Sequence, residues 1–121
     1  MSKNALFVCF GCLSNLGRIT GLAALKVVEE VGIEKANIFC LGALATGGEL
    51  VIEKTRAVKR IITVDGCSLN CAKKIVEGAG FVPDATINLM EDLRMIKGGP
   101  LDYTDEDVLR AKEAIKKTLS D

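Results

Sequence analysis

Five cysteines and no histidine define the chemistry open to this chain of 121 residues. Without imidazole, Ser–His and Cys–His catalytic pairs and zinc sites with histidine ligands are excluded, so any metal site must use thiolates, with carboxylates as the other choice. Thiolates select zinc, copper(I) or an iron–sulfur cluster over magnesium or calcium. We therefore predict a thiol-based site, preferably for zinc. Its candidate ligands are Cys9, Cys12, Cys40, Cys67 and Cys71.

The cysteines fall into two close pairs and one singleton. Cys9 and Cys12 form a C-x-x-C, and Cys67 and Cys71 form a C-x-x-x-C. Both spacings allow a short turn to bring two sulfurs to one tetrahedral metal ion at about 2.3 Å. Two such pairs complete a four-sulfur site, and Cys40 can replace one member. A single cysteine is equally well explained as a small hydrophobic residue buried in the core. Five cysteines in this arrangement favour a site.

The elements that must position these thiols alternate between strands and helices. Strands are predicted at residues 5–10, 37–41 and 60–64, each ending at or just before a cysteine, with a fourth at 86–90. Helices are predicted at 15–31, 49–59, 68–78 and from Thr104 onward. This alternation predicts one α/β domain over residues 1–121, a three-layer sandwich with a mainly parallel sheet of about four strands.

A parallel sheet gives the scattered cysteines a common location. The carboxyl ends of parallel strands share one edge, and open α/β sheets bind their ligands there. We therefore expect Cys9, Cys40, Cys67 and Cys71 to converge on one cleft. The residues 43–48 between the second strand and the next helix are interpreted as a flexible connector.

Composition limits the partners. Sixteen basic and sixteen acidic residues balance to zero net charge, and no long basic run supports nucleic-acid binding. No apolar stretch reaches membrane-spanning length, and the first residues lack a cleavable signal pattern, so we expect a cytoplasmic protein without a membrane partner. The partners we expect are a metal ion and, if the site is catalytic, a small-molecule substrate. The oligomeric state is not predicted.

Residues 62–74, ITVDGCSLNCAKK, resemble the central signature of the DGC-domain family, whose members are described as zinc-binding proteins of unknown function. The resemblance extends to residues 8–11 and 14–17, and to 40–43. It implies a zinc site and places the four cysteines of the family on Cys9, Cys40, Cys67 and Cys71. Cys12 departs from the commoner pattern, and the resemblance implies no particular reaction.

A thiol enzyme is the alternative. Cys12 and Arg18 form a C-x5-R, the spacing at which phosphatases and some arsenate reductases place a nucleophilic thiolate among backbone amides, with arginine holding the oxyanion. Arg18 is explained more simply as an exposed helix residue. Dithiol redox chemistry through Cys9 and Cys12 is a second enzymatic alternative.

Overall fold

The computed structural model describes residues 2–119 and confirms the alternation of strands and helices. The strands are β1 (Asn4–Val8), β2 (Ala36–Ile38), β3 (Arg60–Asp65) and β4 (Ala85–Asn88). The helices are α1 (Asn15–Val31), α2 (Leu41–Ala45), α3 (Glu49–Ala57), α4 (Cys71–Gly78), α5 (Leu89–Asp92) and α6 (Asp105–Thr118). None of the helices in the described part of the chain has the length and apolar character needed to cross a bilayer.

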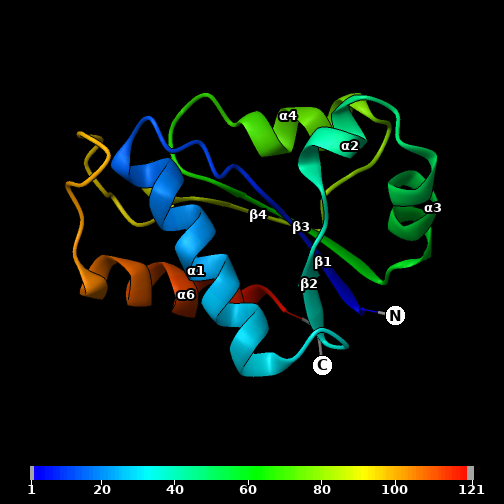
Figure 1. The fold of residues 1–121 in the computed structure, drawn as a ribbon, viewed down its shortest axis with the longest axis horizontal. Coiled ribbons are helices and arrows are strands. Elements are labelled where there is room, and N and C mark those ends of the chain that lie inside the picture. Colours follow the sequence, from blue (N-terminus) through cyan, green and yellow to red (C-terminus); the bar gives the residue numbers. More distant parts are fainter. Residues whose placement is uncertain (1, 120–121) are drawn as a thin grey trace.

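The four strands form one parallel sheet in the order β2-β1-β3-β4. Helices α1 and α6 pack together on one face, whereas α2 and α4 cover the other (Figure 1). This is the three-layer α/β architecture that the sequence predicts. The strands are buried on both faces, as expected when helices cover a parallel sheet on each side.

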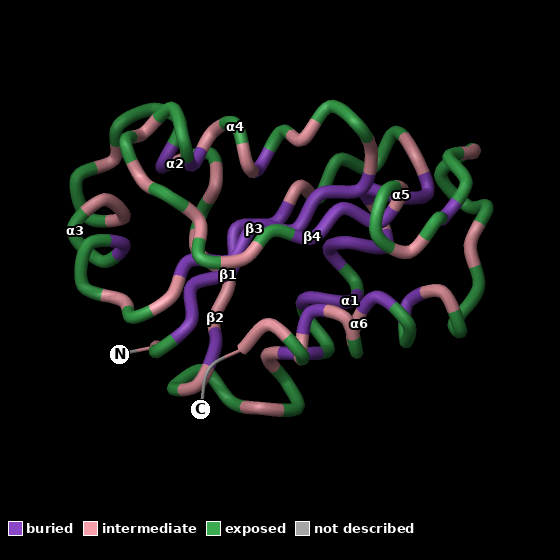
Figure 2. The backbone as a smooth tube through the Cα atoms, turned by 180° about the vertical axis from the view of Figure 1, so that it is seen from behind, coloured by how far each residue is buried: buried purple, intermediate pink, exposed green. Residues whose placement is uncertain are grey.

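Alternate residues of the central strand supply both halves of the core. In β1, Leu6 and Val8 pack with α1 and α6, whereas Ala5 and Phe7 pack with residues of α2 and α4. Figure 2 shows the buried residues concentrated along the strands, between the two helical layers. The ends of the strands are consequently fixed by packing on both sides.

The strand order creates a switch point between β1 and β3. After β1 the chain turns to α1 on one face of the sheet, and after the adjacent β3 it turns to α4 on the opposite face. The loops leaving the two strands thus turn to opposite faces at the carboxyl edge, which is the usual ligand position in open α/β sheets.

Two short helices were not expected from the sequence. Residues 43–48 are not simply a flexible connector, because α2 covers Leu41–Ala45 and its cap is the Cys40 side chain, which accepts a hydrogen bond from the Ala43 N–H (3.3 Å). The predicted strand at 86–90 ends at Asn88, whose side chain caps α5.

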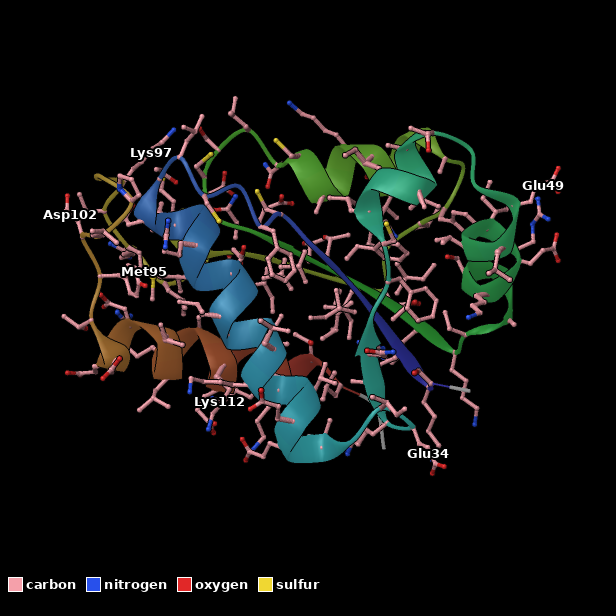
Figure 3. The ribbon with its side chains drawn as sticks, in the orientation of Figure 1. Glu34, Glu49, Met95, Lys97, Asp102 and Lys112 are labelled. Atoms are coloured by element: carbon pink, nitrogen blue, oxygen red, sulfur yellow. The ribbon has the colours of Figure 1, made fainter. Side chains whose placement is uncertain are left out.

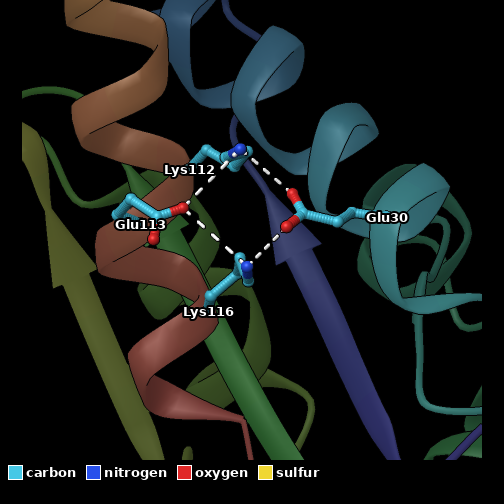
Figure 4. A network of polar contacts seen from close by, with 4 residues as sticks. All are labelled: Glu30, Lys112, Glu113 and Lys116. Atoms are coloured by element: carbon cyan, nitrogen blue, oxygen red, sulfur yellow. Dashed lines mark hydrogen bonds and ion pairs between the residues drawn. The ribbon is translucent and has the colours of Figure 1, made fainter.

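The two longest helices begin where their capping residues predict. Ser14 caps α1 through the Gly17 N–H, and Thr104 and Asp107 form a capping box at the start of α6. The two helices are joined by Glu30 of α1, which lies 3.0 Å from Lys112 Nζ and 2.6 Å from Lys116 Nζ (Figure 4). Glu113 contacts the same two lysines at longer distances.

Candidate thiol site

Cys9 lies directly beyond the end of β1, at the switch point. Its backbone N–H donates to the Val64 carbonyl of β3 (3.0 Å), so the residue is held against the neighbouring strand. The next residue, Phe10, has a φ of 51°, and its N–H donates to Thr20 Oγ1 of α1. This left-handed residue turns the chain away from the sheet and leaves the half-buried Cys9 thiol at the edge.

Two glycines bring the β1 and β3 loops together. A Cβ atom on Gly66, just after β3, would lie 2.7 Å from the carbonyl carbon of Leu16 in α1. A Cβ atom on Gly17 would collide with the carbonyl oxygen of Gly11 in the β1 loop. Because only glycine permits these approaches, the loop with Cys9 and the loop with Cys67 both pack against the first turn of α1.

Asp65 organises the loop between Cys67 and Cys71. The two carboxylate oxygens accept hydrogen bonds from the backbone N–H groups of Ala72 (2.7 Å) and Lys73 (3.0 Å) in the first turn of α4. The helix predicted to begin at Ser68 begins three residues later: α4 starts at Cys71, after Asn70 in the left-handed conformation. A side chain from the preceding strand replaces the local cap, and this non-local contact is not visible in the local sequence pattern.

Asn88 fixes the same loop from β4. Its side-chain amide donates to the carbonyl oxygen of Cys67 and to Asn70 Oδ1, both at 2.8 Å. Its side-chain oxygen accepts from the Met90 and Glu91 N–H groups. Sequence reasoning missed Asn88, although an asparagine at the end of a strand, directly before a helix, is a typical capping signal.

Cys9, Cys67 and Cys71 share one electrostatic environment. Burial raises the pKa of the Cys9 thiol, and a hydrogen bond from the Gly11 backbone N–H opposes that effect. The negative charges of Asp65, Cys71 and Cys67 raise the Cys9 pKa further. Burial also raises the pKa of Asp65, whereas the Ala72 and Lys73 N–H groups and the charges of Lys73 and Lys74 lower it. Asp65 thus lies close to the Cys9 thiol, with two lysines beside the carboxylate.

Cys40 lies at the carboxyl end of β2, the neighbour of β1, where its exposed side chain caps α2. The three strands that precede Cys9, Cys40 and Cys67 are parallel, so these residues follow the same edge of the sheet. Within residues 2–119, however, no three Cys, Asp or Glu side chains are arranged closely enough to hold a metal ion. The shared cleft stays a prediction.

The structure does not support the oxyanion-binding loop that a phosphatase would need around Cys12. The exposed Cys12 thiol donates to the Phe10 carbonyl (3.3 Å), and its contacts within residues 2–119 include no hydrogen bond from a backbone amide. The Leu16 and Gly17 N–H groups at the start of α1 already donate to Asn15 and Ser14. Arg18 is half-buried rather than exposed, and its buried Nε has no hydrogen-bond partner in the described structure.

Asn15 holds a long loop beside the site. Its buried side chain donates to the carbonyl oxygens of Ile96 and Asp102 and accepts from the Gly98 N–H. Figure 3 shows Lys97 and Asp102 on this loop, next to the beginning of α1. Asn15 therefore has a structural role, and its polar atoms are used within the fold.

These observations define a parallel α/β protein with cysteines in the two loops that leave the switch point of its sheet. A family model described as the DGC domain matches residues 5–115, and the chain belongs to this family. It is similar to the "Anaerobic and virulence modulator AnvM" of Pseudomonas aeruginosa, with 26% identity over 86 residues. The match covers 71% of this chain and 63% of AnvM, so the chain spans less than two thirds of that relative. No solved structure matches the chain.

Proposed function

We propose that this protein binds one zinc ion through cysteine thiolates at the carboxyl edge of its sheet. Cys9, Cys67 and Cys71 would hold the ion from the two loops that flank the switch point. Cys40 would supply the fourth sulfur from the end of β2. The observation that carries this proposal is the parallel pairing of β2, β1 and β3, which brings Cys40, Cys9 and Cys67 to the same edge of the sheet.

The donor set fits zinc in its chemistry. Four thiolates without imidazole match a closed, structural zinc site better than a catalytic one, which keeps a position open for water or substrate. The N–H groups of Gly11 and Ala43 already point to the sulfurs of Cys9 and Cys40, and such bonds orient metal ligands and stabilise thiolates. When bound, zinc would neutralise part of the negative charge and cross-link the loops.

The arrangement still has to close around the ion, because the described side chains do not yet surround a common centre. We attribute closure to side-chain rotation of the cysteines on backbones that Asp65 and Asn88 hold in place. Reduced thiols are required throughout, which agrees with the cytoplasmic location that we also propose.

Zinc content of serine variants tests the proposal. The protein, purified without oxygen and saturated with zinc, is freed of excess metal and analysed by elemental mass spectrometry. We expect one zinc per chain in the wild type and less than a tenth of that in Cys67→Ser and Cys71→Ser, because each loses a ligand. Cys12→Ser is the matched control and should keep its zinc. Equal zinc content in all three variants, or none in the wild type, would refute the site.

A further inference from the structure

The outward face of α6 borders an open hollow whose lining, within the described part of the chain, contains no cysteine. The hollow has a volume of about 620 Å³ and lies between β4, α5 and α6. Its apolar lining includes Ile87 of β4, Leu93 just after α5 and Leu109 of α6, which is 47% exposed. Because β4 is the last strand of the sheet, this hollow runs along the edge of the sheet.

One side of α6 supplies most of the rim, and we call it the outer face of α6. It consists of Glu106, Leu109, Arg110, Glu113, Ala114 and Lys117. At about 100° per residue these six positions span about 140° of the helix circumference. Val108, Ala111 and Ile115, which are buried in the core, lie on the opposite side.

The charges on this face alternate in sign along the helix. Glu106, Arg110, Glu113 and Lys117 follow one another at intervals of four, three and four residues. In an antiparallel pair of α6 helices related by a two-fold axis between Ala111 and Lys112, Glu106 of one copy faces Lys117 of the other. The same axis places Arg110 opposite Glu113, so all four charges meet an opposite charge.

The apolar residues obey the same symmetry. Leu109 and Ala114 are equally far from the axis along the helix and lie at the two borders of the outer face, so in the pair they flank the charged residues of both copies. A parallel, in-register pair would instead oppose each charge with itself. One two-fold operation therefore matches all four charged positions, as an isologous interface requires.

We infer that the outer face of α6 is a self-association surface, and that its occupant is a second copy of this chain in antiparallel orientation. Two intramolecular contacts are compatible with this pairing. Arg110 donates to the Leu93 carbonyl (3.0 Å), which holds its guanidinium at the rim. Glu113 lies 3.6 Å and 3.9 Å from Lys112 and Lys116, in exposed and therefore weak pairs.

The size of the surface predicts a weak dimer. A 14-residue helix is about 21 Å long, and one helix pair with the adjoining hollow buries less than a standard interface of about 1,600 Å². Association should therefore depend on concentration. It should also weaken as salt screens the charges at the rim.

A charge swap tests the pairing by sedimentation velocity between about 10 µM and 1 mM. Glu106→Lys opposes two cations at each end of the helix pair and should raise the dimer dissociation constant at least about tenfold. The double variant Glu106→Lys/Lys117→Glu restores opposite charges and should return the constant to within about threefold of the wild type. Glu77→Lys, on exposed α4, is the control for net charge.

Circular dichroism and thermal unfolding of each variant separate misfolding from lost association. A wild type that is monomeric throughout this range would overturn the inference. So would a double variant that is folded but as dissociated as Glu106→Lys, because the pairing would then be wrong. Zinc content plays no part in these readouts, so the result is independent of the thiol site.

Discussion

At the scale of single residues, the thiol loops are held by contacts that leave little tolerance. The Asp65 carboxylate accepts hydrogen bonds from backbone N–H groups in the first turn of α4. Gly66 allows the β3 loop to lie against Leu16 of α1. The two residues adjoin Cys67, so the backbone of this candidate ligand is fixed before any metal is bound. The position of the Cys67 loop depends on the absence of a Cβ atom at Gly66.

Gly66→Ala should therefore destabilise the fold. The added Cβ would lie 2.7 Å from the Leu16 carbonyl carbon, a backbone atom that cannot move alone, and we expect the free energy of unfolding to fall by about 1–3 kcal/mol. Gly42→Ala is the matched control, because a Cβ there meets nothing within 4 Å and the residue lies in α2. It should leave stability unchanged or raise it by up to about 1 kcal/mol. Urea denaturation measures both, and equal effects would contradict this account.

At the scale of helices and strands, local signals predicted more than non-local ones. The α1 helix begins and ends as expected because Ser14 and Gly32 are local signals, and the capping box of α6 is equally local. The start of α4 was missed because its cap comes from Asp65 in the preceding strand. α2 was missed because the small residues and glycines of this segment resemble a connector, whereas its cap is a cysteine.

The contact between α1 and α6 makes a prediction about pH. Hydrogen bonds from Lys116 and Lys112 lower the pKa of Glu30, so the charged form is favoured in the folded state. The stabilisation is present above the ordinary pKa of glutamate and is lost as pH falls through the lower, folded value. Glu30→Gln should lose a small amount of stability at neutral pH and none in acid, as measured by thermal unfolding over a pH series. Glu30 is exposed and its two lysine partners are partly exposed, so high salt should reduce the difference.

If Glu30→Gln instead destabilises the protein equally in acid and at neutral pH, the contribution of Glu30 comes from packing and not from its charge. Glu53→Gln is a suitable control, since the exposed Glu53 of α3 forms an ion pair with Arg56 of the same helix. This variant should show the same dependence of thermal stability on pH as the wild type.

At the scale of the whole molecule, parallel topology explains why distant cysteines meet one edge. The pattern of strands predicted this edge for Cys9, Cys40 and Cys67, and the order β2-β1-β3-β4 adds that the first and last of these flank the switch point. The sequence could not predict the strand order itself, nor the role of Asn88, because both depend on packing between segments far apart in the chain. Among residues 2–119, those that line the hollow beside the outer face of α6 include no cysteine.

Zinc K-edge X-ray absorption of the zinc-loaded protein tests the central claim most directly. The account predicts a first shell of four sulfurs at about 2.3 Å, the signature of a closed thiolate site. Cys12→Ser should leave the spectrum unchanged, because Cys12 is not one of the four proposed ligands. A shell of nitrogen or oxygen alone, at about 2.0–2.2 Å, would contradict the proposal that these cysteines form the zinc site.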